Sequence, residues 1–544
     1  MWRPLPTLPG PILSTGVFDS EDSTVSDSSM TSGHTRTLQV AMFATGCSGI
    51  VAEYVLSTLA TYLLGNAIFQ WSIVMSMMLF SMGVGSRVSR SFRNHLLDTF
   101  IIIEFSLSLF CAASGAIVFG FAAWTEARIF IIYSLALVVG LFIGMEIPLA
   151  TRINSDYQAL RSNISAVMEM DYFGSLLGGL LFAFLLLPFL GLTYTPLVLG
   201  SINFAVAGFL FLRFKHLVRS RRLITVLFAL VLLVLMVLAV AVRPIVRYGE
   251  QKKYKDLVVL SRQTQFQKIV MTRWKQWYWL YINGDEQFST YDEERYHEPL
   301  VHPAMELALN PERILVLGGG DGLAVREILK HKIVKRITLV DIDGVMTDLA
   351  QHHPLFTAIN QGAMNDPRVT VLNMDASSFL DSDDGLYNVI FIDLPDPDSM
   401  DLMHLYAQGF YRDLLKRLAR GGMVVTQASS PYFAKKAFLC IKKTMEAAGL
   451  VTLPYHNQVP TLGEWGWILG TSEGDITGER LKTAASRLEF NDIKTRFLNP
   501  DAMKAMVLFG KGLFDTGDAD AIKINTISNP VLLQYYQEGS WGVY

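Results

Sequence analysis

The sequence predicts an α-helical transmembrane bundle followed by an α/β domain, in which a small β-meander precedes a Rossmann-like doubly wound sheet. Three observations predict this fold class. Seven long apolar runs with almost no charge precede residue 243, alternating strand patterns follow them, and units of strand, glycine turn and helix begin near residue 312. A chain of 544 residues is also too long for one ordinary globular core, so at least two structural units are expected.

Composition limits the function classes. The formal net charge of −3 gives no large field of one sign, so nucleic-acid binding is not expected. The three cysteines, Cys47, Cys111 and Cys440, lie far apart and form no cluster with histidine. The sequence therefore predicts neither a metal site nor a disulfide.

The pattern along the chain predicts five segments. Residues 1–37 are rich in Ser, Thr, Pro and Asp, which is typical of a disordered tail. The remaining boundaries predict a transmembrane domain at 38–243, a small β domain at 244–310, the Rossmann-like domain at 311–470, and a C-terminal extension at 471–544 packed on it.

The apolar runs have the length of helices that cross a bilayer, about 20 residues. They are expected at 38–64, 67–86, 99–124, 129–150, 172–190, 195–212 and 223–242. They predict a multi-pass protein of the cell membrane, with the lipid bilayer as a partner. The pairs Gly140/Gly144 and Gly174/Gly178 have the spacing that allows close helix contacts.

Three carboxylates, Glu53, Glu104 and Glu146, fall inside the expected spans. Such residues are costly in lipid and usually functional, but pairing with hydroxyls or arginines to fix helix packing is an equally open interpretation.

The basic loops 87–93, 152–161 and 213–222 predict a cytoplasmic location for those loops. With seven spans the α/β domain would then face outward. Three interpretations stay open: one run does not cross, the basic stretch 247–255 also lies inside, or the domain is external.

Polar motifs follow the strands of the α/β domain. Residues 318–322, "GGGDG", form a glycine turn after the strand "RILVL", and glycines such as Gly318 and Gly320 let a backbone approach a ligand closely. The next strand ends at Asp341, about 20 residues on, where a carboxylate can accept hydrogen bonds from ribose hydroxyls. The third ends at Asp375, where an acid can bind an adenine amine. A role for either acid as a helix N-cap is an equally open alternative.

The fourth strand ends in "DLPDP", which places Asp393 and Asp396 three residues apart on a loop stiffened by prolines. Paired carboxylates can hold an ammonium group, and one of them can have a raised pKa suited to base work. Tyr296, His297 and Glu298 precede a helix that should bring them to the same cleft.

The ordered motifs resemble spermidine synthases, the polyamine aminopropyltransferases. They include "FQKIV", "NGDEQFSTYDEERYHEPLVHP", "LVLGGGDGLAVREIL", "LVDID", "MDA", "YNVIFIDLPDP" and "LYAQGFYRDLLKRLARGGMVVTQASSP", within about residues 256–470. The apolar block in front is similar to the membrane-fused bacterial branch of that family, which implies the bacterial inner membrane.

The resemblance implies a role for each matching residue. Gln267, Asp341, Asp375 and Ala376 would hold the nucleoside of decarboxylated S-adenosylmethionine, which is a co-substrate, so no permanently bound cofactor is expected. The amine site would take putrescine or another polyamine, and Asp393 would accept its proton. The amine-site residues are Tyr296, His297, Asp321 and Asp396. A homodimer through the catalytic domain is a further possibility.

The sequence departs from the family at three places. Asp341 stands where the family usually has Glu, the loop after Pro397 lacks a Gly-Pro element, and segment 460–464 lacks a tyrosine that in the family faces the acceptor. The identity of the acceptor amine therefore stays open.

Two alternative functions are weighed against aminopropyl transfer. One is an S-adenosylmethionine-dependent methyltransferase, or a transferase for another amine. Asp321 argues against methyl transfer, because an acid in the glycine turn would repel the carboxylate that the ordinary cofactor retains. The other is a polyamine transporter or sensor, based on the carboxylates in the spans.

Overall fold

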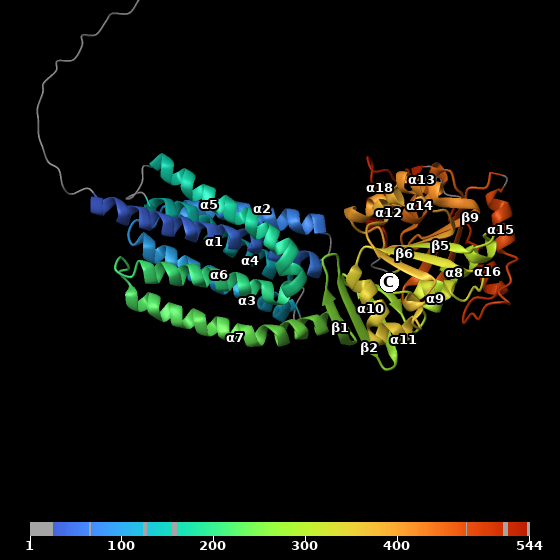
Figure 1. The fold of residues 1–544 in the computed structure, drawn as a ribbon, viewed down its shortest axis with the longest axis horizontal. Coiled ribbons are helices and arrows are strands. Elements are labelled where there is room, and N and C mark those ends of the chain that lie inside the picture. Colours follow the sequence, from blue (N-terminus) through green and yellow to red (C-terminus); the bar gives the residue numbers. More distant parts are fainter. Residues whose placement is uncertain are drawn as a thin grey trace, which may run out of the picture.

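The computed structural model describes residues 25–64, 67–122, 128–154, 160–474, 476–514 and 521–540. A helical bundle forms one part of the molecule and an α/β domain the other, with a four-stranded sheet at their junction (Figure 1).

The bundle contains long helices at the places where the apolar runs predict them. They are α1 (Val25–Leu64), α2 (Ala67–Ser89), α3 (Leu96–Ala122), α4 (Arg128–Asn154), α5 (Leu160–Leu181), the π-helical segment η1 (Phe182–Leu190), α6 (Gly191–Arg213) and α7 (Arg221–Lys253). Six helical stretches are long and apolar enough to cross a membrane by length and composition, within the described residues. One of them, 162–213, is 52 residues long because α5, η1 and α6 are continuous. Pro188 lies in η1, and a proline cannot donate the backbone hydrogen bond of a regular α-helix.

The prediction of a disordered tail to residue 37 is wrong for its last part. Helix α1 begins at Val25, because the Ser/Thr-rich segment continues directly into the apolar run. Thr35 and Thr37 are already buried at 5% and 8% exposure, and Leu38 at 1%. The rest of that prediction, residues 1–24, lies outside the described residues.

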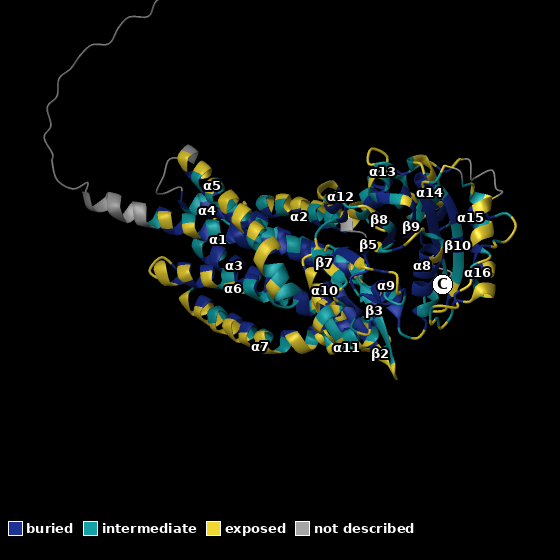
Figure 2. Cartoon of the chain, turned by 45° about the vertical axis from the view of Figure 1, so that its right-hand side comes forward, coloured by how far each residue is buried: buried dark blue, intermediate teal, exposed yellow. Residues whose placement is uncertain are grey.

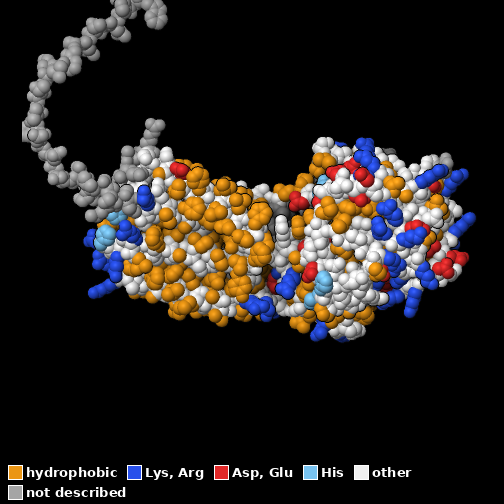
Figure 3. All heavy atoms as spheres, viewed as in Figure 1, with side chains coloured by type: hydrophobic (Ala, Val, Ile, Leu, Met, Phe, Trp, Pro, Cys, Tyr) orange, Lys and Arg blue, Asp and Glu red, His pale blue; other side chains and the backbone are white. Residues whose placement is uncertain are grey.

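Small residues bring the helices close together, as their spacing predicts. A Cβ on Gly140 or Gly144 of α4 would collide with backbone of α2, at 2.8 Å from the Met78 oxygen in the first case. A Cβ on Gly174 or Gly178 of α5 would likewise collide with backbone of α1. The outer surface of the bundle is apolar (Figure 3), and its outward helix faces are exposed in Figure 2. This surface suits lipid contact.

The junction sheet is the predicted antiparallel meander. Its strands are β1 (Leu257–Gln263), β2 (Lys268–Trp274), β3 (Trp277–Ile282) and β4 (Asp285–Ser289), paired in that order. Asn283 and Gly284, which connect β3 to β4, have φ of 55° and 108°, the positive values that a type I′ turn requires. The Lys268 ammonium contacts Glu250 of α7 at 2.6 Å, which links the sheet to the bundle.

The α/β domain is built on a seven-stranded sheet in the order β10-β11-β9-β8-β5-β6-β7. Its strands are β5 (Arg313–Gly318), β6 (Arg336–Asp341), β7 (Val369–Asn373), β8 (Tyr387–Asp393), β9 (Leu418–Gln427), β10 (Val451–Val459) and β11 (Gly463–Thr471). The sheet is doubly wound, as predicted, with β5 to β9 parallel, but β11 pairs antiparallel with both β9 and β10. A short connection joins β10 to β11, and it forms a hairpin instead of the helical crossover that parallel strands require.

Helices cover both faces of this sheet. One buried cluster joins the sheet to α8 (Glu294–Leu307) and α9 (Leu323–Ile328), and the other joins it to α13 (Gln408–Arg417) and α14 (Lys435–Ala448). The other helical segments are α10 (Gly344–His352), α11 (Pro354–Ile359), η2 (Ala363–Asn365), α12 (Ala376–Ser382) and η3 (Met400–Tyr406), then α15 (Gly478–Ala485), α16 (Pro500–Met506) and α18 (Val531–Gln537). The chain order reverses between β5 and β8, where such sheets bind ligands.

The C-terminal segment is tied to α8. The buried Glu298 carboxylate accepts the backbone N–H groups of Arg496, Phe497 and Leu498 at 2.6, 2.9 and 2.8 Å. The sequence predicted that Glu298 would reach the cleft, but the carboxylate instead anchors the extension.

Candidate active site

The glycine turn after β5 lies directly against the end of β8. The Gly319 N–H donates to the Asp393 carbonyl oxygen at 2.9 Å. A Cβ on Gly318, whose φ is +80°, would lie only 2.2 Å from that oxygen. Only glycine therefore fits here, and the turn brings the Asp393 side chain to the switch point of the sheet.

Asp341, at the end of β6, orders the same turn. Its Oδ2 accepts the Gly320 N–H at 3.0 Å and its Oδ1 accepts the Asp343 N–H at 2.8 Å. A Cβ on Gly320 would lie 2.5 Å from Asp341 Oδ2, so a larger residue here would displace the Asp341 carboxylate. Burial raises the pKa of Asp341 to about 6.

Gln267 reaches this region from the junction sheet. Its Nε2 donates to Asp343 Oδ2 at 2.8 Å, while Asp343 Oδ1 caps α10 through the Val345 N–H. Sequence reasoning assigned no role to Asp343, although a buried acid that caps a helix is recognisable from its position.

Asp375 is the N-cap of α12, the alternative that the sequence left open. Its Oδ1 accepts the Ser378 N–H at 2.8 Å, and Ala376 is the first residue of that helix. The other oxygen, Oδ2, lies 3.7 Å from His404. The cap fixes the Asp375 carboxylate beside the ends of β6 and β7.

Asp393 is held by Tyr296 of α8. The Tyr296 hydroxyl donates to Asp393 Oδ1 at 2.8 Å, across 97 residues of sequence. Burial and the nearby Asp321 raise the pKa of Asp393 to about 6, although His297 and the Tyr296 hydrogen bond oppose this shift. Near neutral pH this carboxyl is thus an ionised group whose basicity exceeds that of an ordinary aspartate.

His297 lies in a buried ion-pair network that sequence reasoning missed. Its Nδ1 is 3.1 Å from Glu293 Oε2, which the Arg326 guanidinium also contacts at 2.8 Å. Burial opposes the positive charge, but Glu293, Asp321 and Asp393 raise the pKa of His297 to about 9. Because a cation repels an ammonium group, this geometry favours a positioning role for His297, and its predicted contact with the amine stays a prediction.

Asp321 faces this network from the glycine turn. Its Oδ1 accepts the Leu323 N–H at 2.8 Å, and burial raises the pKa of its carboxyl while His297 lowers it.

Asp396 is contacted by the C-terminal helix. The Tyr536 hydroxyl donates to Asp396 Oδ2 at 2.8 Å, and the Ser429 hydroxyl lies 3.5 Å from the same oxygen. Its buried Oδ1 has no hydrogen-bond partner within the described ranges. Burial raises the pKa of Asp396 to about 7. Nothing in the local sequence around Tyr536 signals this contact, because the helix reaches the site only through the tertiary fold.

Further acids surround Asp396. Asp398 on the same loop and Asp285 on β4 both raise its pKa. Two hydrogen bonds to its backbone hold the loop in place. The Tyr406 hydroxyl donates to the Pro395 carbonyl at 2.9 Å, and the Gln427 side-chain amide donates to the Leu394 carbonyl at 2.9 Å. A site rich in carboxylates on a rigid loop suits a ligand with more than one positive charge.

Two groups of predicted residues are thus brought together at the strand ends. One group, around the ends of β5, β6 and β7, contains Gly318, Gly320, Asp341, Asp375 and Ala376, with Gln267 bound to Asp343 beside it. The other group contains Tyr296, Asp321, Asp393 and Asp396, with His297 behind them.

Comparisons with known proteins identify the family to which the chain belongs. Residues 293–480 match the spermine/spermidine synthase domain, so the α/β part is a transferase domain of that class. A polyamine aminopropyltransferase of Aquifex aeolicus is 38% identical over 500 residues, covering 92% of this chain and 98% of that protein. A polyamine aminopropyltransferase of Leptospira interrogans is 36% identical over 505 residues, covering 92% and 97%. The chain belongs to the polyamine aminopropyltransferase family, and the similarity extends into the helical bundle.

Among solved structures, spermidine synthase from Thermotoga maritima covers 47% of this chain and 86% of its own, with 22% identity and a TM-score of 0.42.

Proposed function

We propose that this enzyme is anchored in the membrane by its helical bundle and transfers the aminopropyl group of decarboxylated S-adenosylmethionine to putrescine. The products would be spermidine and methylthioadenosine. The observation that carries the proposal is the Asp393 carboxylate, hydrogen-bonded to Tyr296 and placed beside the glycine turn and Asp396.

The reaction needs an unprotonated amine. One amino group of the diamine gives its proton to Asp393, and its nitrogen lone pair then attacks the methylene carbon bonded to the sulfonium. A carbon–nitrogen bond forms as the carbon–sulfur bond breaks, and the electron pair of that bond returns to sulfur. The sulfonium becomes the neutral thioether of methylthioadenosine. The enzyme contributes alignment and a base, because the leaving group is already activated.

The donor nucleoside would bind across the ends of β5, β6 and β7. Asp341 would accept hydrogen bonds from the ribose hydroxyls, and Asp375 from the adenine amine. Asp321 supports a decarboxylated donor, because an acid in the glycine turn would attract its ammonium group and repel a carboxylate.

The acceptor would occupy the acidic side of the site. Asp396 would bind the distal ammonium of the diamine, with Asp285 and Asp398 adding negative potential. Putrescine carries two positive charges in a short chain, which suits two carboxylates three residues apart. Tyr536 would close this side of the acceptor site.

Product analysis with the purified full-length enzyme tests the proposal. Decarboxylated S-adenosylmethionine plus putrescine should yield equimolar spermidine and methylthioadenosine. A methylated amine from S-adenosylmethionine, with no methylthioadenosine, would contradict it. If another amine gave a larger product with a higher kcat/KM than putrescine, only the proposed identity of the acceptor would be wrong.

Membrane anchoring is a separate part of the proposal. It is supported by the six long apolar stretches and by the apolar outer surface of the bundle. The protein should stay with membranes after alkaline carbonate washing, and detergent should release it. A reporter fused at the C-terminus would show which side of the membrane the enzyme faces.

A second candidate function rests on buried carboxylates in the bundle. Glu104 and Glu146 are 0% and 2% exposed, and neither oxygen of Glu104 accepts a hydrogen bond within the described residues. Such groups could form part of a cation path. Glu53→Gln, Glu104→Gln and Glu146→Gln should then change polyamine flux in vesicles and leave transfer intact. Unchanged flux with lowered thermal stability would instead support the packing interpretation.

A further inference from the structure

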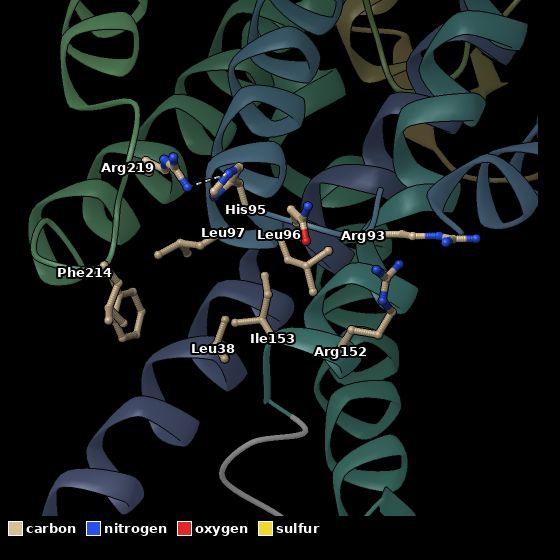
Figure 4. A pocket seen from close by; sticks show the side chains of 11 residues that line it. Leu38, Arg93, His95, Leu96, Leu97, Arg152, Ile153, Phe214 and Arg219 are labelled. Atoms are coloured by element: carbon tan, nitrogen blue, oxygen red, sulfur yellow. Dashed lines mark hydrogen bonds between the residues drawn. The ribbon is translucent and has the colours of Figure 1, made fainter. Parts of the chain in front are cut away.

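A cavity of about 600 Å³, drawn from close by in Figure 4, lies at the end of the bundle farthest from the catalytic domain (Figure 1). Four segments form it: the first part of α1, the connection from α2 to α3, the end of α4, and the connection from α6 to α7. None of these segments belongs to the candidate active site.

The polar side of the cavity is cationic. Arg93, His95, Arg152 and Arg219 line it (Figure 4), and Arg219 Nη1 lies 3.5 Å from His95 Nε2. No carboxylate among the described residues forms an ion pair with Arg93 or Arg219. The carboxylate of the neighbouring Asp98 is already hydrogen-bonded to the backbone: its two oxygens accept the N–H groups of Arg219 at 3.2 Å and Ser220 at 2.8 Å.

Two of these residues are positioned by the backbone. Arg152 donates from Nη1 to the Ser89 carbonyl at 2.9 Å and from Nη2 to the Phe92 carbonyl. His95 has φ of +57°, which is uncommon outside glycine, and its carbonyl accepts the Thr99 N–H at 3.0 Å. Arg219 and His95 thus lie together on one side of the cavity, and Arg93 and Arg152 lie on the other (Figure 4).

Apart from Asn94, the rest of the lining is apolar. It consists of Leu38, Leu96, Leu97, Ile153, Phe214 and Leu217. Leu38 is buried at 1% exposure, whereas Leu217 is 50% exposed at the rim. A site for a small soluble anion needs only polar donors, so the apolar half indicates a ligand with a hydrocarbon part attached to its anionic group.

The surroundings fit such a ligand. The cavity lies at the end of the bundle where Lys, Arg and His side chains border the apolar outer surface (Figure 3). A phosphate placed here would meet guanidinium groups at the level of lipid headgroups, and its acyl chains could follow the apolar surface.

We propose that this arginine-lined cavity binds the headgroup of an anionic phospholipid, with Arg219 and His95 at the phosphate, Arg93 adding positive charge from the opposite side, and the leucine-rich side against the first part of an acyl chain. This inference rests on the proposed insertion of the bundle in a membrane.

The test compares two double variants of the full-length protein in nanodiscs. Arg93→Gln/Arg219→Gln removes two charges from the cavity, and Arg213→Gln/Arg222→Gln removes two exposed charges at the same end of the bundle that do not line it. Retention of phosphatidylglycerol over phosphatidylcholine is measured by native mass spectrometry. The cavity variant should lose about tenfold or more in preference for phosphatidylglycerol, and the control variant should match the wild type.

Two further measurements distinguish a lipid phosphate group from soluble inorganic phosphate as the ligand. Inorganic phosphate at the same concentration should not displace the lipid, and Leu217→Ser should weaken lipid retention by several-fold. Displacement by inorganic phosphate would overturn the lipid assignment in favour of a soluble anion. Equal loss in both double variants would overturn the site, since it would show a general charge effect. Failure of the protein to remain in washed membranes would instead refute membrane insertion itself.

Discussion

The hydroxyl of Tyr536 lies 2.8 Å from Oδ2 of Asp396, a residue 140 positions earlier in the chain. Tyr536 lies in α18, and Glu538, directly after that helix, forms an ion pair with Lys436 of α14 at 2.6 Å. The C-terminal segment therefore supplies a tyrosine to the acidic side of the site, while segment 460–464 lacks the one expected from the family.

Tyr536→Phe should raise the KM for the diamine by about tenfold and leave the KM for the nucleoside donor unchanged. The hydrogen bond from Tyr536 lowers the pKa of Asp396, so its loss leaves less of the ammonium-binding carboxylate ionised near pH 7. Tyr535→Phe, on the same helix, is the matched control, because its hydroxyl contacts Lys523 instead. Steady-state kinetics with each substrate varied in turn would refute the assignment if the two variants behaved alike.

Tyr296→Phe should change the pH dependence of the reaction. The Tyr296 hydrogen bond stabilises the ionised form of Asp393, whose pKa is about 6. Without it the pKa rises, so the acidic limb of kcat/KM should move to higher pH by about one unit. Tyr291→Phe, an exposed tyrosine close in sequence, should leave the limb in place. If the acidic limb of kcat/KM did not move in Tyr296→Phe, the pH profile would report the ionisation of a group other than Asp393.

Asp341→Asn should weaken binding of methylthioadenosine by roughly 10- to 100-fold, measured by calorimetry, with little effect on diamine binding. The amide would present an N–H₂ to a backbone N–H of Gly320 or Asp343, and the ribose hydroxyls would lose a charged acceptor. Asp348→Asn on the exposed side of α10 controls for surface charge. Equal losses for both ligands would contradict a nucleoside role.

His297 should make thermal stability depend on pH in one direction. Its pKa in the folded protein is about 9, above the ordinary 6.5, so its contribution is complete below about pH 6.5 and is lost as the pH rises through 9. The Tm difference between wild type and His297→Gln should thus be largest near pH 6 and shrink toward pH 10. His352→Gln, at an exposed pair, should show no such trend. A difference independent of pH would mean that His297 is not charged.

The positions of the strand-end acids in the fold could be predicted because each follows an apolar strand, and parallel strands bring their carboxyl ends to one edge. The sequence could not predict partners that depend on tertiary contacts. Glu298, Tyr536 and the Glu293–Arg326 pair carry no local signal, since their partners lie 33 to 200 residues away. The antiparallel end of the sheet was missed for a different reason, because strand patterns alone do not reveal strand direction.

Asp393 is central to this account, and the most direct measurement is single-turnover formation of methylthioadenosine by Asp393→Asn across a range of pH. The substitution keeps the shape of the side chain and its contact with Tyr296, but removes the base. We expect the rate at neutral pH to fall by about 10²- to 10⁴-fold with nucleoside affinity nearly unchanged, and to recover partly at high pH, where free amine is available. If Asp393→Asn kept most of its rate at neutral pH, another group would be the base and the proposed mechanism would be wrong.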